Sequence, residues 1–325
     1  MTQRNVLEAI NNALDEEMSA DPRVMVLGLD VGKLGGVFRA TSGLLEKHGA
    51  QRVVDTPLAE ASIIGASLGL AISGMVPVAE IQFLGFTAQA FHQIGPQLGR
   101  YRARSRGRFN CQVTVRAPFG GGISSPEFHS DAVEAQFVQS PGIKVVMPSN
   151  AHDAKGLLIE AIRDPDPVLY CEPDRLYRLG RMEVPDGAYT VPFGKAAVVR
   201  EGDDITLVAW SAAVETCLIA AERLADEGIS ATVVDLRTLV PLDVETLVGA
   251  VAKTGRCVVV HEAPLSAGFG AEVVATLASE AFYDLDAPIA RVTSYDVPYP
   301  AAPLERWYLP TVERVVAAAR RTARQ

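Results

Sequence analysis

The stretch TPLAEASIIGASLGLAISGMVPVAEIQF, residues 56–83, sets the architecture expected for this chain. Its first part, residues 56–73, is rich in small and apolar residues and predicts a helix, with Thr56 as the hydroxyl cap and Pro57 as the first helical residue. The apolar run at 76–83 then predicts a buried strand. A helix that leads straight into a buried strand is typical of a parallel sheet covered by helices on both faces.

The same alternation continues on both sides of this stretch. Further segments of the first half predict strands at 24–30, 111–118, 143–149 and 167–173, and helices at 6–18, 131–140 and 151–164. A loop-like segment with two prolines and three glycines follows at 179–194, and a second alternation runs from 204 to 296. We therefore expect an α/β protein with one domain at 1–180, a linker at 181–194 and a second domain at 195–325.

Composition narrows the class of protein. Hydrophobic residues make up 48% of the 325 residues, which is enough for large cores, and the net charge of −9 argues against sequence-independent binding of nucleic acid. The basic run Arg100–Arg108 is either a solvated helix end or a docking surface for an acidic partner. Neither a membrane span nor a signal peptide is indicated, so a cytoplasmic protein is expected. The four cysteines lack CxxC spacing and are expected to be reduced core thiols that form no zinc site.

Glu60 is the one acid in an otherwise apolar and small-residue helix. It is either a solvated first-turn acid favoured by the helix dipole or an acid at a contact surface. The second interpretation rests on a ridge of small side chains at four-residue spacing, which would let another helix approach closely: Ala61, Gly65, Gly69 and Ser73. A carboxyl group desolvated there would have a raised pKa unless it met a donor or a cation. Such an acid could hold a proton on a nitrogen heterocycle.

With these residues in place, the chain resembles the beta subunits of the decarboxylase component of 2-oxo acid dehydrogenase complexes. The resemblance covers nearly the whole chain and rests on segments 24–41, 55–83, 101–122, 129–149, 161–173, 233–243 and 294–310. The variants RFNC at 108–111 and HSD at 129–131 favour the branched-chain type within that family.

The resemblance implies a fold, a reaction and a set of site residues. It implies a transketolase-like pyrimidine-binding domain followed by a transketolase C-terminal-like domain. The reaction is oxidative decarboxylation of a 2-oxo acid, with reductive acylation of lipoamide, and it depends on thiamine diphosphate. Glu60 matches the acid that hydrogen-bonds the aminopyrimidine ring nitrogen of the cofactor, Phe86 an aromatic residue beside that ring, and His129 the proton donor during acyl transfer.

The family also implies partners, because the chain lacks the GDG…N motif that holds magnesium and the diphosphate. An alpha subunit would carry that motif and the Mg²⁺, and we expect an alpha2beta2 heterotetramer with the cofactor between the chains. The lipoyl and subunit-binding domains of a dihydrolipoyl acyltransferase would be further partners. By residue match, oxygens of five residues would hold a structural potassium ion: Val113, Ala161, Ile162, Asp164 and Asp166. The alternative there is a plain Asp-Pro turn.

Two departures from the family pattern concern communication between paired active sites. Leu29 and His92 stand where the family commonly has acids that line a polar passage. Two other functions remain open at this stage: the beta subunit of a pyruvate or acetoin dehydrogenase, and an assembly subunit with no catalytic role.

Overall fold

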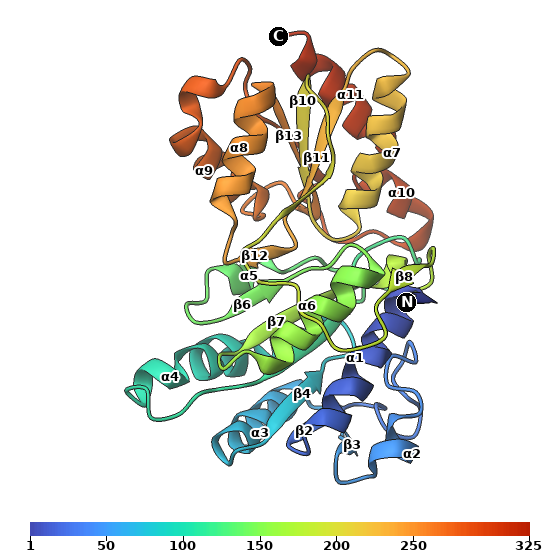
Figure 1. Cartoon of the computed structure of the whole chain (residues 1–325), viewed down its shortest axis with the longest axis vertical. Coiled ribbons are helices and arrows are strands. Elements are labelled where there is room, and N and C mark those ends of the chain that lie inside the picture. The colour runs from blue at the N-terminus through green and yellow to red at the C-terminus, as the bar shows by residue number, and fades with distance from the viewer.

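Seven strands form the sheet of the first half in the computed structural model, which describes residues 1–325 (Figure 1). The strand order is β12-β6-β7-β5-β4-β2-β3, and all neighbours pair in parallel except β12. The strands are β2 (Val24–Gly28), β3 (Val53–Asp55), β4 (Val76–Glu80), β5 (Thr114–Phe119), β6 (Lys144–Val146), β7 (Val168–Pro173) and β12 (Thr238–Val240).

Helices cover both faces of this sheet. Helices α1 (Val6–Ala20) and α6 (Ala151–Arg163) pack together over one face, where Val24 and Val26 of β2 point. Helix α3 (Glu60–Ile72), the 3₁₀ helix η1 (Leu84–Ala90) and the π-helix η2 (Gln93–Gly99) cover the other face, where Leu27 points. Alternate residues of β2 thus enter opposite cores, as the period of two in a strand requires. Short helices complete this half: α2 (Leu44–His48), α4 (Arg100–Arg104), α5 (Ala135–Val138) and η3 (Asp174–Leu176).

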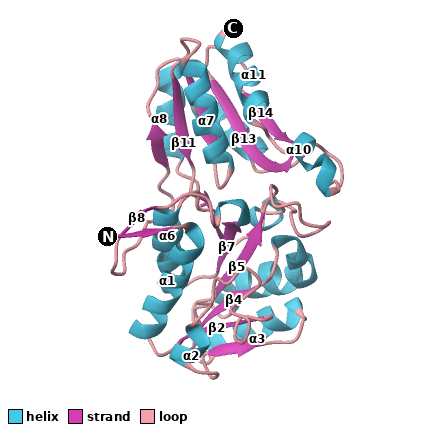
Figure 2. Ribbon diagram, turned by 90° about the vertical axis from the view of Figure 1, so that its right-hand side faces the viewer, coloured by secondary structure: helices cyan, strands magenta, loops and turns pink.

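The second half is a five-stranded sheet in the order β14-β13-β10-β11-β9, stacked end to end on the first half (Figures 1 and 2). Its strands are β9 (Ala197–Arg200), β10 (Ile205–Ala209), β11 (Ala231–Asp235), β13 (Cys257–Pro264) and β14 (Ala290–Ser294). Helices α7 (Ala213–Ala225) and α11 (Val312–Ala323) cover one face. Helices α8 (Val244–Thr254) and α9 (Gly270–Glu280) cover the other, and η4 (Phe282–Asp284), η5 (Ala302–Leu304) and α10 (Glu305–Tyr308) follow.

The predicted α/β class with parallel sheets is confirmed, but the expected start of α3 is wrong. The helix begins at Glu60 with Ala59 as its cap, and no side chain caps it. Thr56 instead continues the extended path of β3, because its N–H donates to the carbonyl of Gly28 at 2.9 Å. The Thr56 hydroxyl, which was expected to cap the helix, makes no hydrogen bond in the chain. Glu60 lies one turn closer to the helix N-terminus than the sequence suggested.

Three further segments differ from expectation. The loop-like stretch at 179–194 contains strand β8 (Met182–Val184), which pairs antiparallel with β1 (Thr2–Arg4) at the start of the chain. Strand β12 leaves the second half and joins the edge of the first sheet beside β6. The helix expected at 131–140 is reduced to the four residues of α5. The first two differences arise from pairing between distant segments, which local periodicity does not report.

All four cysteines are buried and unpaired. No helix has both the length and the apolar character needed to cross a membrane.

The junction between the halves buries several acids, of which Asp174 is the least compensated. Asp174 opens η3, directly after β7, and neither of its carboxylate oxygens has a hydrogen-bond partner. Burial, reinforced by the nearby charge of Glu262, raises the pKa of Asp174 to about 9. The folded chain therefore keeps a proton there that the unfolded chain loses above about pH 4.

This proton gives a testable pH dependence. Between about pH 4 and pH 9 the folded state binds one proton more than the unfolded state. The contribution of Asp174 to stability therefore falls as the pH rises, by at most about 1.4 kcal/mol for each pH unit. Asp174→Asn removes this titration. We expect the melting temperature of the variant, relative to the wild type, to be several degrees higher at pH 8 than at pH 5. An equal difference at both pH values would contradict the prediction.

Candidate active site

Glu60 lies on the wall of an open cavity of about 480 Å³ at the N-terminus of α3. The other lining residues come from the segment before the helix, from the first turn of α3 and from η1: Leu58, Ala59, Ala61, Phe86 and Gln89. Two of the predicted site residues, Glu60 and Phe86, therefore share one cavity. Its walls combine one carboxylate with apolar surface, a combination that suits a flat, nitrogen-containing ring.

The carboxylate of Glu60 has no partner within the chain. It makes neither a hydrogen bond nor an ion pair, and its residue is half-buried rather than fully buried. The ridge behind it is open as well, because a Cβ built on Gly65 or Gly69 would meet no atom within 4 Å. The close helix contact that these glycines predict is thus absent from the chain itself. This face of α3 is therefore uncovered in the single chain.

His129 joins the same site through aromatic contacts. Its ring centroid lies 5.0 Å from that of Phe86 and 4.5 Å from that of Phe83, and the two phenylalanine rings meet edge to face at 5.7 Å. The fold thus brings together residues 60, 86 and 129 from α3, η1 and the loop after β5. The sequence analysis missed Phe83, which reads as the last apolar residue of a strand.

The hydrogen bond of His129 fixes which ring nitrogen is free. Nδ1 lies 3.0 Å from the carbonyl oxygen of Glu127. A carbonyl can only accept, so Nδ1 carries the proton and Nε2 is left available in the neutral ring. Asp131, the acid of the HSD variant, makes no ion pair with His129 within 4 Å. Burial, and then the charge of Glu127, raises the pKa of Asp131 itself.

Gly85 is a second residue that the sequence analysis missed. A Cβ at this position would lie 2.2 Å from the carbonyl oxygen of Phe128. Only glycine therefore lets η1 approach the loop that carries His129. The pattern FLGF contains this signal, but glycine in an apolar segment is equally typical of a turn or a strand bulge.

Four of the five residues of the predicted potassium site lie at or just after the end of α6, and Val113 directly precedes β5, but the two carboxylates are already paired. Lys144 Nζ lies 2.6 Å from Asp164 Oδ1, and Arg102 donates to both oxygens of Asp166 at 2.8 Å. The carbonyl of Ile162 accepts from Gln112 at 2.8 Å, and that of Val113 from Val168 at 3.0 Å. These side chains do not fit an alkali ion held by carboxylates. A site built from main-chain oxygens, including that of Ala161, stays a prediction.

Neither Leu29 nor His92, the two departures from the family pattern, lines the cavity of Glu60. Leu29 is half-buried after β2, whereas His92 is exposed and bonds Gln97 at 2.8 Å.

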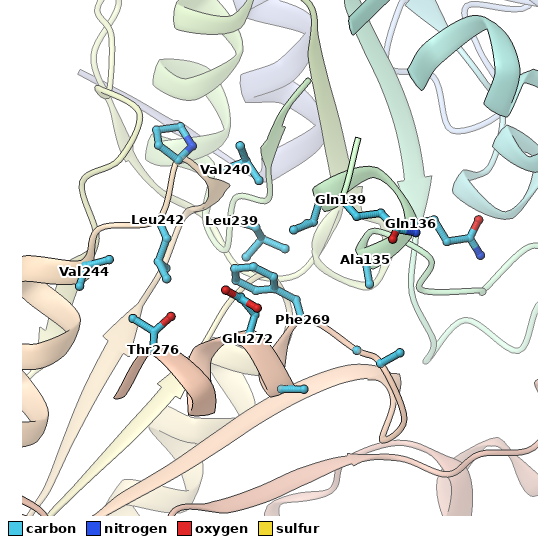
Figure 3. Close-up of a pocket in the computed structure, with 15 residues that line it drawn as sticks. Ala135, Gln136, Gln139, Leu239, Val240, Leu242, Val244, Phe269, Glu272 and Thr276 are labelled. Carbon is cyan, nitrogen blue, oxygen red and sulfur yellow. The ribbon is translucent and has the colours of Figure 1, made fainter. Parts of the chain in front are cut away.

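A larger cavity of about 820 Å³ lies elsewhere, between the halves (Figure 3). Residues from α5, the segment after β12 and α9 line it, among them Gln139, Leu242, Phe269 and Glu272. It contains none of the predicted site residues. Size alone does not identify the active site here, because the smaller cavity holds the acid and the aromatic residue that the chemistry needs.

The chain matches known protein families over most of its length. Residues 2–180 match the pyrimidine binding domain of transketolase, and residues 194–315 match the transketolase C-terminal domain. Over 322 residues the chain is 50% identical to the pyruvate dehydrogenase E1 component subunit beta of Staphylococcus epidermidis, covering 99% of both chains. The subunit of the same name from Staphylococcus aureus is 49% identical over the same length, again with 99% of both chains covered.

Solved structures extend the comparison to the whole fold. A split-gene transketolase, described as an inactive beta4 tetramer, superposes with a TM-score of 0.81 at 28% identity and covers 99% of both chains. A transketolase variant from Pichia stipitis superposes with a TM-score of 0.70 at 16% identity, with 100% of this chain and 46% of that chain covered. The second likeness concerns the fold alone.

Proposed function

The chain belongs to the E1 beta subunits of thiamine diphosphate-dependent 2-oxo acid dehydrogenases, and we propose that it supplies one half of an active site shared with an alpha subunit. The observation that carries this proposal is the partnerless carboxylate of Glu60 on the wall of an open cavity that it shares with Phe86. In one chain this acid has nothing to act on. A cofactor ring held between two chains would give it a partner.

Bound thiamine diphosphate would supply the nucleophilic carbon and the electron sink for decarboxylation. Glu60 would hold a proton at the aminopyrimidine ring nitrogen, and Phe86 would pack beside that ring. His129 would present Nε2 toward the acyl group, because its Nδ1 is engaged by Glu127. When Nε2 is protonated as well, it would donate that proton during acyl transfer to a lipoyl domain of the acyltransferase component.

The alpha subunit would contribute what this chain lacks. The chain lacks the GDG…N motif that holds magnesium and the diphosphate in this family, so both are assigned to the alpha subunit. The open ridge at Gly65 and Gly69 supports a closely packed helix from another chain. We propose an alpha2beta2 heterotetramer that docks on the subunit-binding domain of the acyltransferase.

Two substrate classes have support of different kinds. The relatives at 49–50% identity carry the name pyruvate dehydrogenase, which favours pyruvate. The RFNC and HSD variants favour branched-chain 2-oxo acids. They are only two short segments, whereas the similarity to the pyruvate dehydrogenase subunits extends over the whole chain. We therefore test pyruvate first and 4-methyl-2-oxopentanoate beside it, by comparing kcat/KM for the purified heterotetramer.

The shared site predicts that neither binding nor turnover occurs on this chain alone. We expect calorimetry to detect no tight binding of thiamine diphosphate and Mg²⁺ to the isolated chain, and tight binding after the alpha subunit is added. Turnover of a 2-oxo acid should appear only in the mixture. The solved split-gene transketolase, whose beta4 tetramer is inactive, supports this expectation. Tight cofactor binding by the isolated chain would contradict the half-site proposal.

A further inference from the structure

The loop that carries His129 runs from Phe119, at the end of β5, to α5, and it is held by the other half of the molecule. The N–H of Gly121 donates to Oε2 of Glu262 at 3.0 Å, and the N–H of Gly122 donates to Oε1 of Glu305, also at 3.0 Å. Glu262 belongs to β13 and Glu305 is the first residue of α10. Two consecutive amides of the first half are thus bound by two carboxylates of the second half.

Both carboxylates are buried, so these bonds matter energetically. Glu262 is 8% exposed and Glu305 is 7% exposed. The hydroxyl of Tyr299 donates to Glu305 Oε1 at 2.5 Å, and Arg175 lies 3.6 Å from Glu262 Oε1. Because a buried carboxylate needs donors, hydrogen bonds from main-chain amides to such groups are stronger than those between neutral groups.

These two hydrogen bonds require glycine at positions 121 and 122 of the segment FGGG, residues 119–122. A Cβ on Gly121 would lie 2.4 Å from the Tyr299 hydroxyl oxygen, and a Cβ on Gly122 would lie 2.5 Å from Cδ of Arg175. Gly122 also has a φ of +106°, which other residues rarely adopt. Three consecutive glycines are typical of a flexible loop, whereas in the structure this loop is hydrogen-bonded to the second half.

The other end of the loop is fixed by the first half. The carbonyl of Phe128 lies against Gly85, and the His129 ring packs against both Phe83 and Phe86. The position of His129 therefore depends on two anchors, one from η1 and one from the carboxylates of β13 and α10.

We propose that Glu262 and Glu305 are positioning residues for His129, which makes the C-terminal half part of the acyl-transfer machinery. The proposal rests on the function proposed for His129. The two carboxylates touch the loop main chain and act through it. Their loss would let the loop move, and would reduce acyl transfer more than decarboxylation, which the site assigns to Glu60.

The experiment uses the alpha2beta2 enzyme with Glu262→Leu, which removes the acceptor, and Glu262→Gln, which keeps an oxygen to accept from Gly121. Reductive acylation of a free lipoyl domain is measured beside decarboxylation with an artificial electron acceptor. We expect Glu262→Leu to lower acylation about tenfold or more, while decarboxylation stays within about threefold. Glu262→Gln should recover most of the acylation rate. Glu280→Leu, at an exposed acid of the same half, is the matched control.

A second measurement does not depend on activity. Hydrogen exchange at the amides of Gly121 and Gly122 should be faster in Glu262→Leu than in the wild type, and unchanged in Glu280→Leu. If the Glu262→Leu chain fails to assemble, Tyr299→Phe is measured instead. It removes the hydroxyl that donates to Glu305 and so weakens that anchor, but it leaves the ion pair of Arg175 with Glu262 in place. The same selective loss of acylation, smaller in size, is then expected.

His129→Ala separates failure of this inference from failure of the proposed function. If His129→Ala lowers acylation but Glu262→Leu and Tyr299→Phe do not, the positioning role is overturned and the role of His129 stands. Equal losses of acylation and decarboxylation in Glu262→Leu would also overturn it. If His129→Ala leaves acylation unchanged, the role of His129 is wrong and the inference fails with it.

Discussion

Glu60→Gln in the reconstituted heterotetramer is expected to lower the decarboxylation rate about 100-fold or more. The amide has nearly the same shape as the carboxyl group, so the cavity shared with Phe86 stays intact. What is lost is a group that can hold and release a proton at a ring nitrogen. Single-turnover decarboxylation of the 2-oxo acid, measured with the artificial electron acceptor, isolates this step from acyl transfer.

Glu245→Gln provides the matched control, because Glu245 is also a first-turn acid, in α8, and is exposed to solvent. Its substitution should leave decarboxylation unchanged. Thiamine diphosphate binding to the Glu60→Gln enzyme should remain measurable, since the alpha subunit is proposed to hold the diphosphate. If Glu60→Gln retains wild-type decarboxylation, the chain is better described as an assembly subunit without a catalytic role.

Arg116→Met is expected to destabilise the first half by about 3–5 kcal/mol. The guanidinium of Arg116 is buried in β5 and bonds Glu172 at 2.6 and 3.0 Å and Glu80 at 2.8 Å. These acids lie on the two neighbouring strands, β7 and β4. Burial raises the pKa of Glu80 even beside the arginine. Removing Arg116 leaves two buried carboxyl groups without their cation.

Chemical denaturation of the isolated chain measures the loss, and pH tests its cause. The unpaired carboxyl groups should bind protons in the folded state, so the destabilisation should be smaller at pH 5 than at pH 8. The triple variant Arg116→Met, Glu80→Gln, Glu172→Gln should be more stable at pH 8 than Arg116→Met alone. A loss that is independent of pH, and that the two amides do not reduce, would indicate a packing effect instead.

Much of the fold was predictable because its signals are local. Each buried parallel strand is a short apolar run, and each covering helix has its own periodicity, so the α/β class follows from the segments one at a time. The start of α3 was not predictable, since Thr56 continues the path of β3 and its N–H donates to the carbonyl of Gly28. Strands β8 and β12 were missed for the same reason, because their partners lie far away in the sequence.

The candidate site, like the fold, was predictable only where its signals are local. The residue types of Glu60, Phe86 and His129 were identified by family resemblance, and their meeting in space was not visible in the spacing of 26 and 43 residues between them. Gly85 and Phe83 acquire their meaning only next to the loop at Phe128 and His129.

The sequence by itself determined the α/β class, the family and the acid at residue 60, because apolar periodicity and residue identity are properties of neighbouring positions. Tertiary structure alone decided that the FGGG loop is bound by Glu262 and Glu305, more than 140 residues further along the chain. It also decided that the ridge of α3 faces open space. Contacts of this kind depend on how two halves pack, and no local pattern in the chain encodes that distance.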